Sequence, residues 1–399
     1  MGVAKVKGMF CKRFIALVTM LTLVCSMLLP YSNASAETGS ALNIEAGAAI
    51  LVEANSGKIL YQKNADELLS IASMTKMMSE YLVHEAVDKG KLKWDQKIKV
   101  SEYAYKVSQD ASLSNVALEN GGSYTVKELY EAMAIFSANG ATIALAEAIA
   151  GKEVDFVKMM NDKSKELGLK NYKFVNSTGL TNKDLKGMHP EGTTADEENK
   201  MSAKDVATLA QHLIKDYPKV LDTAKIPKKE FRPEKEKFAM SNWNWMLKGL
   251  VKEYDGVDGL KTGSTPEAGD CFTGTVERNG MRFISVVIKT SSHTARFDET
   301  KKLYDYGFAN FEMKQMYKKG SSVKGQEAPI KKGAALGQMV ITPKDTNDPG
   351  FLTGKSLQVD LVTTSEVEEA NWFTRAMRGI GSFFSGIWNS AVDTVKGWF

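Results

Sequence analysis

Cysteine is scarce in this chain, with three among 399 residues. Cys11 and Cys25 lie in an N-terminal segment that we expect to be removed, which leaves Cys271 alone in the mature protein. A single cysteine excludes an internal disulfide, even in an oxidising compartment. Cys271 falls in a run that is typical of a β-strand, so we expect it to be a buried apolar residue.

Beyond its N-terminal segment, the chain also lacks an excess of either charge. The formal net charge is +4, but the whole excess comes from Lys5, Lys7, Lys12 and Arg13, because residues 1–36 contain no acidic residue. Without that segment the basic and acidic residues balance. No basic patch remains that would favour a nucleic-acid partner.

The N-terminal segment itself has the pattern of an export signal. Its basic start is followed by an apolar run from Phe14 to Leu29 and then by Ala34-Ser35-Ala36, a small-x-small cleavage site. The alternative is an uncleaved membrane helix, but the run is short for a bilayer span of about 20 residues. We therefore expect cleavage after Ala36 and export.

Alternating and helical apolar patterns predict the secondary structure of the rest. Strands are expected at Ala48–Glu53 and Lys58–Gln62, joined by a turn, and again at Leu260–Thr265, Cys271–Glu277 and Arg282–Ile288. Helices are expected from about Ser73 to Val87, at Val126–Ala134, Ala141–Ala150, Val154–Leu167 and Ala203–Lys215, and from about Phe297 to Phe311. Ser202 is a fitting N-cap, and Asn279-Gly280 predicts a tight hairpin.

The order of these elements predicts one α/β domain over residues 37–312, whose sheet is assembled from both ends of the segment around an inserted helical block. Residues 313–366 shift to Lys, Gly, Pro and Thr with two short β-like runs, Ala335–Ile341 and Ser356–Val362. They predict a small β-rich module. Residues 367–399 form a separate tail.

Two familiar kinds of catalytic site are absent. The chain has no Gly-x-Ser-x-Gly elbow, which argues against an α/β-hydrolase. The four histidines show no metal-binding spacing, and we expect each to be structural or exposed: His84, His189, His212 and His293.

The first motif that carries chemistry is Ser73-Met74-Thr75-Lys76 at the start of a predicted helix. Residues three apart share a helix face, so the lysine amine can reach the serine hydroxyl. A lysine acts as a base only when its pKa is depressed, which burial and a helix N-terminus both favour. The same spacing recurs by chance at Ser321-Ser322-Val323-Lys324, where a solvated loop is the simpler interpretation.

Two further motifs occur once each. Ser137-Ala138-Asn139 lies at a break between two predicted helices, and a helix cap is its simplest interpretation in isolation. Lys261-Thr262-Gly263 lies in a predicted strand, where Gly263 would let a substrate backbone approach and Lys261 offers charge for a carboxylate. Alone, that segment could be an ordinary edge strand.

Together and in this order, the three motifs resemble those of the penicillin-recognising serine enzymes. Residues 37–311 resemble D-alanyl-D-alanine carboxypeptidases of the low-molecular-mass penicillin-binding type, with supporting stretches at 69–78, 242–244, 258–265 and 296–299. The resemblance implies the β-lactamase/transpeptidase-like fold, in which helices flank an antiparallel sheet. It also implies a peptidoglycan stem peptide ending in D-Ala-D-Ala as substrate, inhibition by β-lactams, and no cofactor or metal.

The resemblance also implies residue roles. Ser73 would be the nucleophile, Lys76 its base, and Ser137 a proton relay to the leaving D-alanine. Asn139 would orient the substrate amide, and the backbone N–H groups of Ser73 and Ser264 would form the oxyanion hole. The substrate carboxylate would be held by Lys261 and Thr262, beside Gly263, with Arg296 as a secondary contact. The family's C-terminal β-rich domain is longer than the module here.

Two alternatives stay open. A β-lactamase of the same fold would need a Glu-x-x-Leu-Asn loop for deacylation, and the sequence has no such string. A non-catalytic wall-associated protein would be free to lose any of the three motifs, yet all three are intact.

The tail indicates a membrane surface. Apolar and aromatic residues recur at helical spacing from Trp372 to Trp398, interleaved with charges such as Arg375, Arg378 and Lys396. Such a helix suits the membrane interface and is too interrupted by Gly and charge to span a bilayer. A helix packed on the protein's own core is the alternative. We expect an exported protein at the outer face of the cytoplasmic membrane or in the cell wall.

Overall fold

The structure is a computed structural model that describes residues 42–232, 234–235, 237–312, 330–333, 335–341, 348–362 and 366. The chain divides into two units, residues 1–43 and 44–399, and the description below concerns the second. The predicted export signal, the Ser321–Lys324 repeat of the serine–lysine spacing and the tail helix lie outside the described residues.

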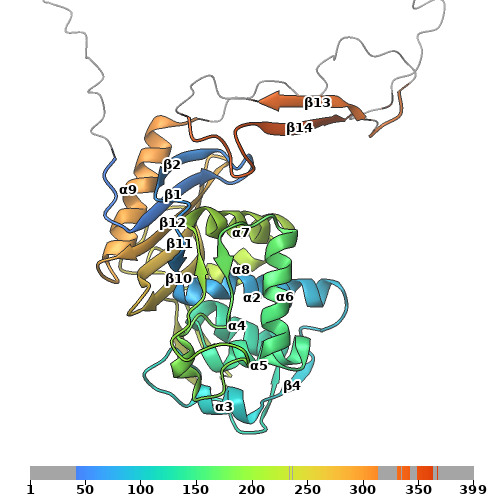
Figure 1. The fold of residues 1–399 in the computed structure, drawn as a ribbon, viewed down its shortest axis with the longest axis vertical. Coiled ribbons are helices and arrows are strands. Elements are labelled where there is room, and N and C mark those ends of the chain that lie inside the picture. Colours follow the sequence, from blue (N-terminus) through green and yellow to red (C-terminus); the bar gives the residue numbers. More distant parts are fainter. Residues whose placement is uncertain are drawn as a thin grey trace, which may run out of the picture. The chain divides into compact units, whose positions relative to one another are not determined.

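A five-stranded antiparallel sheet forms the upper part of the domain in Figure 1. Its order is β10-β11-β12-β1-β2, so β1 pairs with β2 on one side and, on the other, with β12, more than 200 residues later, as in the register Ala48↔Ile288. The strands are β1 (Ala48–Glu53), β2 (Ile59–Lys63), β10 (Val257–Thr265), β11 (Gly269–Arg278) and β12 (Met281–Thr290). The predicted assembly of the sheet from both ends of the domain is confirmed.

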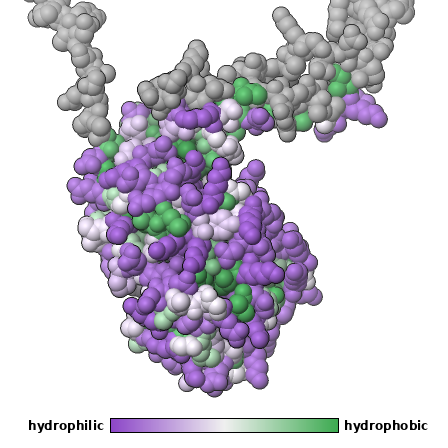
Figure 2. Space-filling view, in the orientation of Figure 1, coloured by the Kyte–Doolittle hydropathy of each residue, from purple (hydrophilic) through white to green (hydrophobic). Residues whose placement is uncertain are grey.

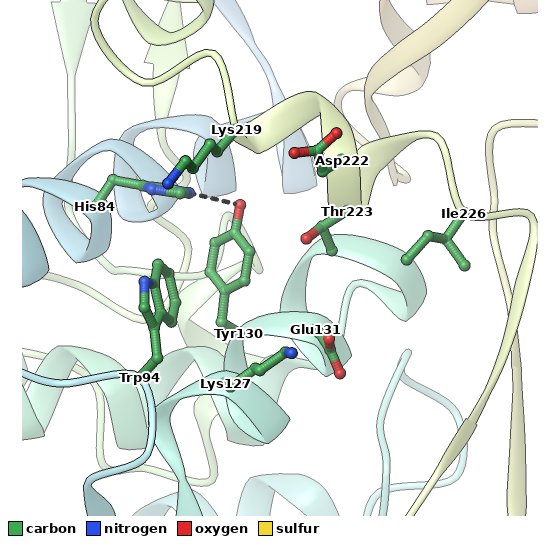
Figure 3. Close-up of a pocket in the computed structure, with 9 residues that line it drawn as sticks. All are labelled: His84, Trp94, Lys127, Tyr130, Glu131, Lys219, Asp222, Thr223 and Ile226. Atoms are coloured by element: carbon green, nitrogen blue, oxygen red, sulfur yellow. Dashed lines mark hydrogen bonds between the residues drawn. The ribbon is translucent and has the colours of Figure 1, made fainter.

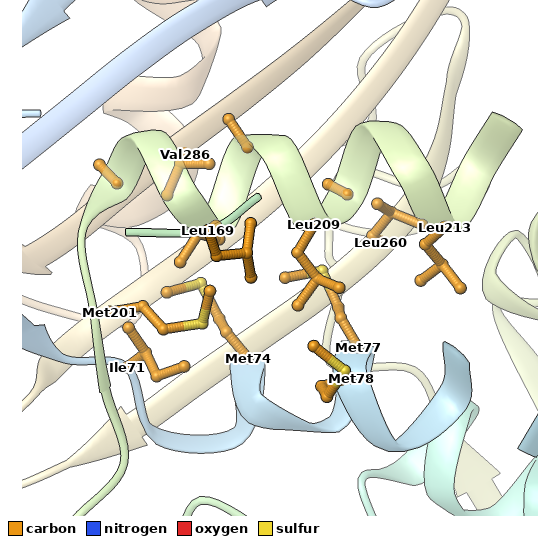
Figure 4. Close-up of a cluster of buried hydrophobic side chains, with 14 of the residues drawn as sticks. Ile71, Met74, Met77, Met78, Leu169, Met201, Leu209, Leu213, Leu260 and Val286 are labelled. Atoms are coloured by element: carbon orange, nitrogen blue, oxygen red, sulfur yellow. The ribbon is translucent and has the colours of Figure 1, made fainter. Parts of the chain in front are cut away.

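Alternation along β12 fills both faces of the sheet. Ile284, Val286 and Ile288 join the apolar cluster under α7 (Ala203–Asp216), which also receives the methionines of the segment after β3 (Figure 4). Phe283 and Ser285 point the other way, toward α9 (Ala295–Asn310). Burial of these apolar side chains, worth about 1.5–3 kcal/mol each, fixes the strand register.

A second apolar cluster lies in the helical block between β2 and β10. Besides α7, the helices of this block are α2 (Lys76–Asp88), α3 (Glu102–Ser108), α4 (Val126–Phe136), α5 (Asn139–Ala150), α6 (Glu153–Glu166) and α8 (Val220–Ala224). Local caps set their ends. Thr125 and Glu128 form a reciprocal capping box at α4, and the predicted N-cap Ser202 accepts a hydrogen bond from the Asp205 N–H at α7.

Short elements complete the domain. Two of them are the 3-10 helices η1 (Ala72–Thr75) and η2 (Asn182–Leu185). The others form three small antiparallel sheets. In the first, β3 (Leu69–Ser70) and β6 (Tyr172–Lys173) both pair with β7 (Lys200–Met201); in the other two, β4 (Lys97–Lys99) pairs with β5 (Ser123–Thr125), and β8 (Lys228–Phe231) with β9 (Phe238–Ser241). In the later segment, β13 (Ala335–Ile341) pairs with β14 (Leu357–Val362).

The predicted helix at Ser73 differs in its start. Ser73 lies in the 3-10 turn η1, and the α-helix begins only at Lys76. Ala72 has φ of 47°, outside the helical region, so the chain enters α2 through a tight turn instead of a full helical turn. The Asn279-Gly280 hairpin is confirmed, with positive φ at both residues, as a type I′ turn requires.

The face of the domain seen in Figure 2 is largely hydrophilic, with small separate apolar patches. No helix in the described part of the chain is long and apolar enough to cross a membrane.

Candidate active site

The three sequence motifs meet where the helical block adjoins the edge strand of the sheet. Ser73 comes from η1, Ser137 and Asn139 from the junction between α4 and α5, and Lys261 to Ser264 from β10. A cavity of about 100 Å³ opens between them. Its lining residues are Ser73, Ser114, Ser137, Trp243, Thr262, Gly263, Ser264, His293 and Arg296.

Lys76 is held by three contacts. Its side-chain nitrogen lies 2.9 Å from Ser73 Oγ, 2.8 Å from Asn139 Oδ1 and 2.7 Å from the Thr178 carbonyl oxygen. Two of these partners are carbonyl oxygens, which only accept hydrogen bonds. A neutral amine has two N–H groups for them and one lone pair, which then faces the serine hydroxyl. The geometry fits a base poised to take the proton of Ser73.

The charge state of Lys76 agrees with this geometry. Its side chain is completely buried. Burial first, and then the charge of Lys261, hold the pKa of Lys76 well below its usual value. The direction agrees with the sequence prediction, with burial as the main cause and Lys261, not the helix N-terminus, as the second.

Ser137 occupies a strained position at the end of α4. Its φ is 62°, in the left-handed region, which a residue with a side chain adopts at a cost on the order of 1–2 kcal/mol. This conformation lets α4 end and α5 begin two residues later. Among the described residues, no group hydrogen-bonds to the buried Ser137 Oγ, although it lines the cavity. Such an unsatisfied buried hydroxyl indicates a site for a ligand group.

Asn139 ties two sides of the site together. Its Oδ1 accepts from Lys76, while its Nδ2 donates to the Ser114 carbonyl oxygen at 2.9 Å. Both ends of the amide are thus engaged, which fixes the orientation of the side chain. The amide holds Lys76 and the loop that carries Ser114 in one arrangement.

Strand β10 passes close to η1 because residue 263 is glycine. A Cβ atom there would lie 2.7 Å from the Ile71 carbonyl oxygen and 3.1 Å from Ala72 Cβ. This agrees with the predicted need for glycine at a close approach, although the atoms that approach belong to the chain itself.

Two cationic side chains lie at β10: Lys261 belongs to the strand, and Arg296 reaches it from α9. The buried ammonium of Lys261 makes one weak hydrogen bond within the described structure, to the Thr262 carbonyl oxygen at 3.3 Å. Burial lowers the pKa of Lys261 to about 8. Arg296 approaches the Gly263 carbonyl oxygen at 3.3 Å and leaves its buried Nε without a partner among the described residues. A bound carboxylate would satisfy both cations.

Sequence reasoning missed several residues of the site. Thr178, whose carbonyl binds Lys76, belongs to a turn in which Asn176 Oδ1 accepts from the backbone N–H groups of Thr178 and Gly179. The run Asn-Ser-Thr-Gly signals such a turn, but no local pattern places it beside Lys76. Ser114, Trp243 and His293 also line the cavity without having been predicted.

Comparisons with known proteins agree with this arrangement. A family model described as D-alanyl-D-alanine carboxypeptidase matches residues 34–292. The D-alanyl-D-alanine carboxypeptidase DacF of Bacillus subtilis is 40% identical over 295 residues, which are 74% of this chain and 69% of DacF.

Solved structures share the fold. A peptidoglycan synthesis regulatory factor (PBP3) of Streptococcus pneumoniae superposes with a TM-score of 0.74 at 36% identity, covering 82% of this chain and 100% of that one. Penicillin-Binding Protein D2 of Listeria monocytogenes, in its ampicillin-bound form, gives a TM-score of 0.55 at 34% identity and covers 67% of this chain and 99% of its own. The predicted β-lactamase/transpeptidase-like fold is confirmed. With matches over most of its length, this chain belongs to the D-alanyl-D-alanine carboxypeptidase family of serine peptidases.

Proposed function

We propose that Ser73 is the nucleophile with which this chain, as a serine D-Ala-D-Ala carboxypeptidase, removes the terminal D-alanine of peptidoglycan stem peptides. Ser73 Oγ would attack the carbonyl carbon between the two D-alanines and pass its proton to Lys76. The C–N bond then breaks, the leaving amine takes up a proton, and water hydrolyses the acyl-enzyme ester. The main support for this proposal is that the Lys76 nitrogen lies 2.9 Å from Ser73 Oγ, while the other two contacts of that nitrogen are to carbonyl oxygens.

The remaining site residues have proposed roles in the same reaction. Ser137, with its unpaired hydroxyl in the cavity, would carry the proton to the leaving D-alanine. Asn139 would orient the substrate amide as well as Lys76. Lys261, Thr262 and Arg296 would hold the terminal carboxylate, with Gly263 keeping β10 close, and the backbone N–H groups of Ser73 and Ser264 would stabilise the oxyanion.

We further propose that β-lactams acylate Ser73 and leave slowly. The Listeria relative was solved with ampicillin bound. The chain also lacks the Glu-x-x-Leu-Asn string with which class A β-lactamases activate their deacylating water. Both observations favour a long-lived adduct over rapid turnover of the drug.

Because this family acts on peptidoglycan, we expect the chain to work at the cell wall. We propose, more finely, that residues 1–36 are cleaved as an export signal, that residues 37–312 form the catalytic domain and 313–366 a shortened β-rich module. The helix predicted at residues 367–399 would lie on the outer face of the cytoplasmic membrane. The basic start of the signal and the amphipathic pattern of the tail support these assignments.

Mass spectrometry of the protein after exposure to labelled penicillin tests the nucleophile. The label should sit on the tryptic peptide that contains Ser73 and should disappear in Ser73→Ala. Release of D-alanine from a D-Ala-D-Ala peptide should be lost in the same variant. Labelling at Ser321 or Ser322 would contradict the assignment, and fast turnover of penicillin would indicate a β-lactamase instead.

A further inference from the structure

A buried carboxylate behind the catalytic lysine has no part in the reaction described above. Lys76, Glu80 and His84 recur every four residues along α2 and therefore lie on one face of the helix. Glu80 is only 3% exposed. A buried acid is costly unless neighbouring groups compensate its charge, so its surroundings indicate its purpose.

Tyr130, on α4, orients the Glu80 carboxylate. The Tyr130 hydroxyl donates to Glu80 Oε2 at 3.3 Å, and His84 Nε2 lies 2.9 Å from the same hydroxyl. A phenol has one hydrogen, which goes to Glu80, so its oxygen accepts from the Nε2–H of His84. Within the described structure, the carboxylate has no other hydrogen bond and is left to act on its neighbours through its charge.

Its charged neighbours are the two lysines of the site. Burial raises the pKa of Glu80 to about 7, against the opposing effects of Lys261, Tyr130 and Lys76. Glu80 in turn raises the pKa of both lysines. Arg296 and Lys261 act in the opposite direction, since Arg296 lowers the pKa of Lys261, and Lys261 that of Lys76. Glu80 is thus the buried acidic group that acts on Lys76 and Lys261, whereas Arg296 has Asp270 as its own acidic partner at 3.5 Å.

We propose that Glu80 is a positioning residue whose negative charge keeps Lys261 protonated as the carboxylate anchor while Lys76 stays neutral as the base. The proposal rests on the proposed roles of those two lysines. Without Glu80, desolvation and Arg296 act unopposed on Lys261, which would lose its proton at lower pH and with it the attraction for a substrate carboxylate.

The far end of this hydrogen-bonded chain reaches a second cavity. Tyr130 and His84 line a cavity of about 420 Å³ together with Trp94, and Figure 3 shows the His84–Tyr130 bond at its edge. Its charged lining residues are Lys127, Glu131, Lys219 and Asp222. Burial, and then Lys219, lower the pKa of His84 to about 4, so its imidazole is neutral at neutral pH.

The test is the pH profile of acylation by labelled penicillin in full-length Glu80→Gln, which keeps the shape of the side chain and removes its charge. Loss of the negative charge lowers the pKa of both lysines. Lys261 loses its proton at lower pH, so the alkaline limb moves down. The acid limb moves less, because Glu80, whose pKa is about 7, carries little charge on the acid side. The ratio of acid to alkaline rates should rise on the order of tenfold, since one pKa unit is a factor of ten.

Two variants keep the test independent of folding. Tyr130→Phe removes the hydrogen bond that favours ionised Glu80 and should move the profile the same way by less. Glu80→Asp keeps the charge, so its pH profile should stay nearer that of the parent chain. Glu85→Gln is the matched control, because Glu85 lies on the same helix but is paired with Lys89 and Lys163 away from the site.

A uniform loss of rate with an unchanged profile in both Glu80→Gln and Tyr130→Phe would show a structural role and overturn the proposal. An equal shift in Glu85→Gln would overturn it as well. Absence of penicillin from Ser73 in the parent chain would instead contradict the proposed function, which separates the two failures.

Discussion

A Cβ atom added at Gly179 would lie 1.9 Å from the carbonyl oxygen of Ala72, the residue before the proposed nucleophile. Gly179 also has φ of 83°, which disfavours any side chain. A Cβ at Gly263 would likewise meet the Ile71 carbonyl oxygen. The turn that presents Ser73 is therefore in close contact with two glycines, one of which no motif had indicated.

Gly179→Ala should displace η1 and slow acylation of Ser73 strongly. The overlap with Ala72 must be relieved by movement of the backbone, and overpacking of this kind costs about 1–3 kcal/mol in addition to the φ penalty. Acylation rates and denaturant unfolding measure the two effects. Gly187→Ala is the control, because Gly187 has φ of 71° but nothing within 4 Å of an added Cβ. Equal losses in both variants would mean that backbone strain alone explains the result.

Lys76→Arg should abolish both acylation by penicillin and hydrolysis of the D-Ala-D-Ala peptide. A guanidinium keeps the positive charge but cannot give up its proton near neutral pH. Lys261→Arg should keep part of its carboxylate binding and so retain measurable acylation. Single-turnover acylation rates of the two variants separate base from anchor, and a near-normal rate in Lys76→Arg would leave Lys76 with a structural role only.

The parent chain should show a bell-shaped pH profile. As pH falls through the lowered pKa of Lys76, the amine gains a proton and loses the lone pair that faces Ser73, so the rate falls. As pH rises past the pKa of Lys261, about 8, the anchor loses its charge and the rate falls again. Rates measured across this range check both limbs. A rate that keeps rising well above that value would exclude Lys261 as a charged anchor.

Cys271 should not react with thiol reagents in the folded protein. It is buried, and burial raises the pKa of its thiol to about 12, so almost no thiolate is present. In a chain that begins at Glu37 it is the one cysteine, so reagent uptake should appear only on denaturation. Rapid labelling without denaturant would show that β11 opens in the native state.

Deletion of residues 371–399 should release the protein from membranes and leave its activity intact. The predicted amphipathic helix lies beyond every catalytic motif, so its loss should not disturb the site. Cell fractionation and D-alanine release measure the two halves. A truncated protein that still sediments with membranes would indicate an anchor elsewhere.

Local sequence patterns were enough to predict most of the strands and helices around the site. The strands around Asn279-Gly280 and the helices of the central block follow from alternation, periodicity and caps, which act over a few residues. The three motifs were found because their residue types are fixed by chemistry. Although Ser73 lies in the 3-10 helix η1 and not in α2, its Oγ still lies within hydrogen-bond distance of the Lys76 nitrogen.

The residues that escaped prediction owe their position to tertiary structure. The Thr178 carbonyl is a backbone atom and leaves no mark in the residue type. Trp243 and His293 reach the cavity from loops whose placement depends on β10 and α9. Helix α3 is too short, at seven residues, for its periodicity to stand out.

The pairing of β1 with β12 also bears on how the protein is made. A ribosome delivers β1 first, and its partner follows some 240 residues later, as the Ala48↔Ile288 register requires. Closing so long a loop is entropically costly, and such non-local pairing slows folding. The growing chain therefore holds Ser73 long before it holds Lys261, and the central sheet cannot close until nearly the whole domain has been synthesised. This delay agrees with the export proposed above, because a sheet that closes late leaves the chain unfolded for longer.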